Sequence, residues 1–137
     1  HCQRHPADTC LSMYFQSFSA SHPFAFDLGH LATWYRDYRR LMQYWEARFP
    51  GRICAVHYRD AVNAPRETLS RVLTHIGLDW DPACDNFHLA AGPVLSASHW
   101  QVRQPVYARS LDRWRNYQKY IPQLLALVED DAPGAAA

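Results

Sequence analysis

An arginine and a serine near the start of the chain have the spacing of an anion-binding pair. Arg4 follows a segment predicted to be the end of a strand, and Ser12 lies a little over two helical turns further on, so both can face one edge of a sheet. A guanidinium fork beside a hydroxyl suits a phosphate dianion, because it offers fixed and charged donors. The alternative is a surface arginine in an ion pair and a serine that points into solvent.

The composition is that of a folded domain without a strong charge bias. The 137 residues are 48% hydrophobic and 20% charged, enough for one domain and too few for two. The formal net charge of +1 argues against a nucleic acid partner, so any anion site must be local. Aromatic residues reach 14%, which indicates a ring-rich core or a site that stacks on planar ligands. No apolar run approaches the roughly 18 residues that a membrane span requires.

The cysteines and histidines form no metal-binding pattern. The four cysteines, at positions 2, 10, 54 and 84, lack zinc spacing, and we expect buried free thiols because a chain of this size folds without disulfides. His1 and His5 are the only histidines at i, i+4 spacing, and no H-E-x-x-H motif follows, so we expect no metal. Free thiols favour the cytoplasm.

Hydrophobic periodicity predicts three longer helices. They are expected over 7–18, with Pro6 in the first turn and Asp8 near the positive end of the dipole; over 28–49, capped by Asp27; and over 65–76, ended by Gly77.

The remaining segments complete an alternating pattern. We expect a strand over 52–58, a short helix that begins within 79–82 and runs to 89, an irregular segment over 94–107, and a last helix that Ser110 caps and Pro122 kinks or ends. This order predicts an α/β layered fold with a parallel sheet. We expect one compact domain over 1–128 and a disordered tail over 129–137.

Four segments, taken in order, resemble motifs of the sulfotransferases that use 3′-phosphoadenosine 5′-phosphosulfate. Arg4 and Ser12 fall on the arginine and serine of the family's 3′-phosphate motif. Tyr58 matches the tyrosine of a strand ending in Tyr-Glu-Asp, with Arg59 in place of the glutamate. The other segments are a Gly-Leu turn at 74–80 and a tail at 96–117 that resembles T-x-S…Q-V-R-Q-P…W-R-x-Y. The resemblance covers residues 2 to 126.

The resemblance implies the C-terminal portion of a P-loop-containing nucleoside triphosphate hydrolase-like fold, truncated at its N-terminus. Arg4 and Ser12 would hold the 3′-phosphate of the nucleotide co-substrate, and Tyr58 would reach its adenine ring. Further nucleotide contacts would come from Ser96, Ser98, Arg103, Arg109 and Ser110. Arg109 and Ser110 stand where better-known relatives carry a basic Arg-Lys-Gly loop, and Arg103 is the alternative. For Trp114 and Tyr117, we expect core packing in preference to stacking on adenine.

The glycine-rich loop that would cradle the 5′-phosphosulfate is missing from the sequence. Its five glycines, at 29, 51, 77, 92 and 134, form no phosphate-loop pattern. The resemblance places the catalytic base upstream, so no catalytic residue is assigned, and we expect the chain alone to be inactive. The intact enzyme would transfer a sulfuryl group in line to a hydroxyl or amine, and sugar, peptide, lipid and phenol acceptors all stay open.

The tail resembles a bacterial branch in which tetratricopeptide repeats often precede the sulfotransferase domain. One alternative function is a catalytically inactive nucleotide-binding or scaffold module of the same fold, which Arg59 suggests because it replaces the family's glutamate. Another is a kinase-like phosphotransferase, which the Gln-Val-Arg-Gln-Pro stretch and the lack of an arginine-rich lid oppose.

Overall fold

The chain divides into two compact units that interleave in the sequence. A computed structural model describes residues 1–16, 18, 22–89, 92–93 and 101–129. One unit holds residues 1–2 and 54–109, and the other holds residues 3–53 and the chain from 110 onward.

A small parallel sheet pairs β1 (Cys2–Gln3) with β2 (Val56–His57). The terminal amine of His1 donates to the carbonyl of Cys54 at 2.9 Å, and its carbonyl accepts from the N–H of Val56 at 2.9 Å. His1 thus bonds to Cys54 and to Val56, the two residues on either side of the position opposite it, as residues of parallel strands do. The predicted strand over 52–58 is too long at both ends, because only Val56 and His57 form the strand that pairs with β1 and the chain turns into a helix at Tyr58.

Two short helices follow β2 in the same unit. α3 (Tyr58–Asn63) ends before Ala64, which leaves the helical region at φ −137° and ψ 64° because the following proline disfavours a helical conformation there, and α4 (Pro65–Ile76) begins at that proline. Gly77 ends α4 in the left-handed conformation, with φ at 76°, as predicted. The unit continues through the 3-10 helices η2 (Pro82–Leu89) and η3 (Gln101–Arg103).

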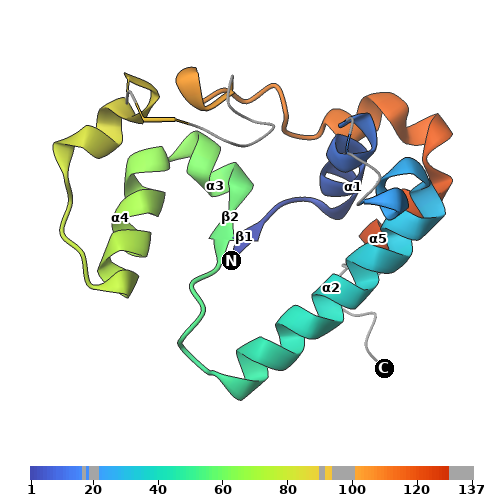
Figure 1. The fold of residues 1–137 in the computed structure, drawn as a ribbon, viewed down its shortest axis with the longest axis horizontal. Helices are drawn as coiled ribbons and strands as arrows, with labels where there is room; N and C mark the ends of the chain where they lie inside the picture. Colours follow the sequence, from blue (N-terminus) through green and yellow to red (C-terminus); the bar gives the residue numbers. More distant parts are fainter. Residues whose placement is uncertain (17, 19–21, 90–91, 94–100, 130–137) are drawn as a thin grey trace. The chain divides into compact units, whose positions relative to one another are not determined.

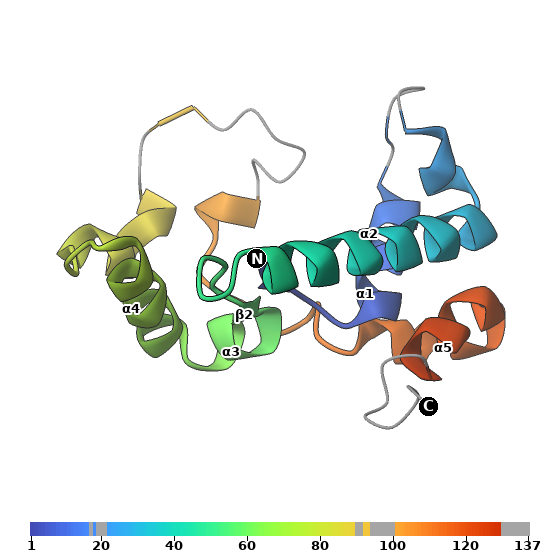
Figure 2. The same cartoon turned by 90° about the horizontal axis from the view of Figure 1, so that it is seen from below.

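Three helices form the core of the other unit. α1 (Pro6–Phe15), α2 (Leu28–Arg48) and α5 (Pro122–Glu129) lie side by side in both views (Figures 1 and 2). Their buried face also receives Trp114 from η4 (Arg113–Tyr120), while η1 (Pro23–Phe26) precedes α2. The core residues are Ala7, Cys10, Leu11, Leu31, Ala32, Tyr35, Trp114, Ile121, Leu124 and Leu127.

The predicted starts of α1 and α2 are confirmed. Pro6 opens α1, and the side chain of Asp27 caps α2 by accepting from the N–H of His30 at 2.8 Å. α1 stops at Phe15, earlier than the predicted end at 18, because Gln16 is extended at φ −84° and ψ 126°.

The last predicted helix is wrong in its type and its cap. Residues 113–120 form a 3-10 helix whose cap position is Asp112, in the left-handed region at φ 54°, and not Ser110. The N–H of Trp114 is engaged by another element, as described below. The 3-10 helix ends at Tyr120, just before Ile121 and Pro122, as predicted for its end, and Pro122 then begins α5, because a proline fits the first turn, where its missing N–H costs nothing.

Candidate functional site

Arg4 lies just after β1 and is fixed by two contacts within its unit. Its Nη2 donates to the backbone carbonyl of Ser110 at 2.6 Å and lies 3.9 Å from Oδ1 of Asp8. The Arg4 side chain is 21% exposed. The guanidinium is therefore held by the fold and still reaches the surface.

Asp8 is the buried centre of this arrangement. Its side chain is 2% exposed, and its Oδ1 accepts a hydrogen bond of 2.9 Å from the backbone N–H of Trp114. As predicted, it lies in the first turn of α1, where the helix dipole favours a carboxylate. Its role as the acceptor for Trp114 was not predicted, although the i, i+4 spacing from Arg4 indicates the ion pair.

The Trp114 ring belongs to the core, as predicted. It is 7% exposed and stacks on the His5 ring with the centroids 4.8 Å and the planes 5° apart. Tyr117 packs against the same core, with its ring edge-on to Phe15 at 5.0 Å. The stacking of Trp114 on His5 and its hydrogen bond to Asp8 join the start of η4 to the start of α1.

Ser12 and Ser110 occupy different environments near Arg4. Ser12 is exposed on α1, one turn beyond Asp8 on the same face of the helix. Ser110 is half-buried, and its contact with Arg4 is made by the backbone carbonyl. The structure thus brings Arg4 and Ser110 together, while the assignment of Arg4 and Ser12 to a phosphate stays a prediction.

The other predicted nucleotide residues belong to the unit that contains β2. Tyr58 is the first residue of α3 and is half-buried. Arg103 donates to the carbonyl of Gly92 at 2.6 Å, and the Arg109 guanidinium lies 4.3 Å from the centre of the Tyr107 ring. Both arginines are exposed. Ser96 and Ser98 lie outside the described residues.

The part of the chain that the structure describes has neither a cluster of metal-binding side chains nor a membrane-spanning helix. No group of three or more histidine, cysteine, aspartate or glutamate side chains that could hold a metal ion occurs there. None of the described helices has both the length and the apolarity needed to cross a membrane. The four cysteines are free thiols, of which Cys10 is buried, Cys2 is exposed and the others are intermediate.

Comparison with known proteins decides the family. Residues 1–82 match the family model described as "Sulfotransferase family". This chain belongs to the sulfotransferase family. The match begins at β1 and ends at the start of η2, so it includes Arg4, α1, α2 and Tyr58.

A relative is similar to the chain over a longer stretch. An "Uncharacterized protein" of Aquifex aeolicus (strain VF5) is 32% identical to this sulfotransferase-family chain over 133 residues. The similar region is 95% of the chain but only 18% of that relative's length. No solved structure matches the chain.

Proposed function

We propose that this chain supplies the 3′-phosphate and adenine side of the donor site in a sulfotransferase that uses 3′-phosphoadenosine 5′-phosphosulfate. The observation that carries the proposal is the fixed position of the Arg4 guanidinium at the end of β1 and the start of α1. Open α/β folds bind their ligands at the carboxyl ends of parallel strands, and Arg4 follows such an end. The family match over residues 1–82 supports the sulfuryl-transfer class.

The contacts of Arg4 make it a preorganised phosphate ligand. The carbonyl of Ser110 and the carboxylate of Asp8 orient the guanidinium before any ligand arrives, so little side-chain entropy remains to be lost on binding. The negative charge of Asp8 opposes a phosphate nearby. That opposition is reduced because the same carboxylate oxygen also accepts the N–H of Trp114. We assign Ser12 the role of a second donor, through its hydroxyl, and Tyr58 the role of the adenine contact.

The chemistry divides between this chain and the rest of the intact protein. In the proposed reaction, the sulfuryl group leaves a phosphate oxygen of the donor, bonds to an acceptor oxygen or nitrogen, and the acceptor proton passes to a base. The chain's own residues hold the nucleotide; the 5′-phosphosulfate loop and the base belong to a P-loop-like half upstream. We therefore expect the chain alone to bind nucleotide without turnover. An upstream tetratricopeptide array and a cytoplasmic location are part of the same proposal.

Calorimetric titration with 3′-phosphoadenosine 5′-phosphate and with adenosine 5′-monophosphate tests the nucleotide site. The two ligands differ only in the 3′-phosphate, and a charge-assisted contact is worth about 1.5–3 kcal/mol, or roughly ten- to a hundredfold in affinity. We expect the bisphosphate to bind more tightly by that factor, and Arg4→Ala and Ser12→Ala to reduce the preference.

Two variants control for unfolding and for a general loss of positive charge. Ser12→Ala changes an exposed position, so it retains the fold even if Arg4→Ala does not. Arg40→Ala removes an exposed arginine of α2 that pairs with Asp37 at 3.3 Å, and it should leave the affinity unchanged. Equal affinity of the folded chain for both ligands would contradict the proposal. A preference for the bisphosphate without sulfuryl transfer by the intact protein would favour the inactive binding module, the alternative suggested by Arg59 in place of the family's glutamate.

A further inference from the structure

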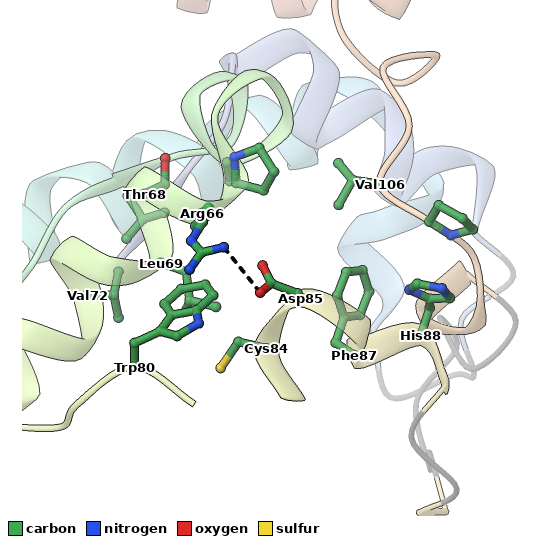
Figure 3. Close-up of a pocket in the computed structure, with 14 residues that line it drawn as sticks. Arg66, Thr68, Leu69, Val72, Trp80, Cys84, Asp85, Phe87, His88 and Val106 are labelled. Atoms are coloured by element: carbon green, nitrogen blue, oxygen red, sulfur yellow. Dashed lines mark hydrogen bonds and ion pairs between the residues drawn. The ribbon is translucent and has the colours of Figure 1, made fainter. Parts of the chain in front are cut away.

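A cavity of about 350 Å³ lies within the unit that contains β2, between α4 and η2. α4 contributes an apolar wall that includes Leu69 and Val72, and Phe87 and Val106 stand on the opposite side (Figure 3). A volume near 350 Å³ is at the lower end for small-molecule sites, which are mostly apolar with a few placed polar groups.

Local sequence signals bring the two walls together. The left-handed Gly77 lets the N–H of Leu78 bond the carbonyl of Leu73 at 2.9 Å, which closes α4 and reverses the chain. Asp81 then starts η2, because its side chain accepts the N–H of Ala83 at 2.7 Å. These two turns place Trp80 and the side chains of η2 against α4.

The polar groups that line the cavity include one pair of opposite charges and two buried nitrogens that lack hydrogen-bond partners among the described residues. The Arg66 guanidinium lies 4.8 Å from the centre of the Trp80 ring and 3.4 Å from the carboxylate of Asp85, so the two charges at the lining offset each other. Among the residues that line the cavity, Nε1 of Trp80 and Nδ1 of His88 are buried without a hydrogen-bond partner in the part of the chain that the structure describes. The indole nitrogen is on the side of its ring that faces Cys84 and Asp85 (Figure 3).

We propose that this cavity binds a neutral aromatic hydroxy compound of one or two rings. The apolar walls and the rings of Trp80 and Phe87 suit a flat hydrocarbon body. A hydroxyl group can accept from the indole N–H of Trp80 and donate to Asp85 or His88, whereas a carboxylate ligand has no proton to donate to either of them. A buried indole N–H without an acceptor is costly, so a ligand that supplies one gains affinity.

Binding of 2-naphthol to the uniformly ¹⁵N-labelled chain, followed by NMR without nucleotide, tests this proposal. We expect saturable shifts of the Trp80 indole N–H signal, which Trp80→Phe identifies by its loss. Trp80→Phe retains an aromatic ring but removes the donor, so the affinity should fall roughly three- to tenfold. Naphthalene, which has no hydroxyl, and 2-naphthoate, which is anionic, should both bind more weakly than 2-naphthol.

The controls distinguish the cavity from unspecific adsorption to exposed rings. Trp34→Phe changes a tryptophan of the other unit and should leave binding intact. Val72→Phe fills the cavity and should abolish binding, and the remaining backbone signals report whether the fold survives. Unchanged affinity in Trp80→Phe, equal binding of naphthalene, or saturable binding by a folded Val72→Phe chain would overturn the proposal. Because no nucleotide is present, none of these results depends on the function proposed above.

Discussion

The carboxylate of Asp8 accepts the backbone N–H of Trp114 at 2.9 Å, although 106 positions separate the two residues in the chain. This bond ties the start of η4 to the first turn of α1, where Arg4 also lies within 3.9 Å of the same carboxylate oxygen. The environment of Arg4 is therefore built by the beginning and the end of the sequence together.

Replacing Asp8 should destabilise the fold more than replacing an exposed aspartate. Asp8→Ala leaves the buried N–H of Trp114 without its acceptor, which typically costs about 1–3 kcal/mol of the free energy of unfolding. Asp8→Asn retains an acceptor and should cost less. Urea unfolding followed by circular dichroism measures both, with the exposed Asp37→Ala as control. A loss for Asp8→Ala no larger than for the control would argue against the bond.

Trp114 should act through packing and not through the nucleotide. Trp114→Ala removes a buried ring, a change that typically costs about 3–5 kcal/mol of unfolding free energy, whereas the exposed Tyr120→Ala in the same 3-10 helix should stay within about 0.5 kcal/mol. Trp114→Phe retains a ring in the core and should keep nucleotide affinity while losing some stability. Reduced affinity in a stably folded Trp114→Phe chain would instead indicate stacking on adenine.

Cys10 should resist alkylation in the folded chain. Burial raises the pKa of its thiol from 9.0 to about 12, so roughly a thousandfold less thiolate is present at pH 8 than in an ordinary cysteine. Mass spectrometry after treatment with iodoacetamide should show Cys2 modified and Cys10 intact, with Cys10 reacting only in denaturing urea. Equally rapid modification of both cysteines in the native chain would contradict the buried position.

Asp27 should make the stability of α2 depend on pH in the acid range. The hydrogen bond from the N–H of His30, followed by the charge of His30, lowers the pKa of Asp27 in the folded chain. Its contribution is therefore complete above the unfolded pKa of about 3.9 and is lost as pH falls through the lower folded value. Asp27→Asn retains the cap without a titrating group.

Thermal unfolding between pH 2 and pH 6 measures this effect. The unfolding midpoint of the original chain should fall toward that of Asp27→Ala as the pH decreases. The difference in midpoint between Asp27→Asn and Asp27→Ala should stay constant, because neither variant has a titrating group at position 27. A constant difference between the original chain and Asp27→Ala across the range would contradict the capping role.

The sequence by itself determined the elements that rest on local interactions. Asp27 and Gly77 mark helix ends because a cap and a left-handed turn are satisfied within a few residues. The apolar spacing of Leu31, Ala32 and Tyr35 likewise gave the buried face of α2. The core position of Trp114 follows from the size and apolarity of its ring.

Only the tertiary structure decided the arrangement around residues 110–122 and the length of β2. The N–H of Trp114, in the first turn of η4, finds its acceptor on α1, so the capping acceptor of this helix is Asp8 and not Ser110, and the helix starts after a left-handed Asp112. The β2 strand extends only as far as it pairs with β1. No local sequence pattern predicts which residues His1 will bond. Long-range partners compete with local preference, and where they supply the stronger hydrogen bond they set the backbone conformation.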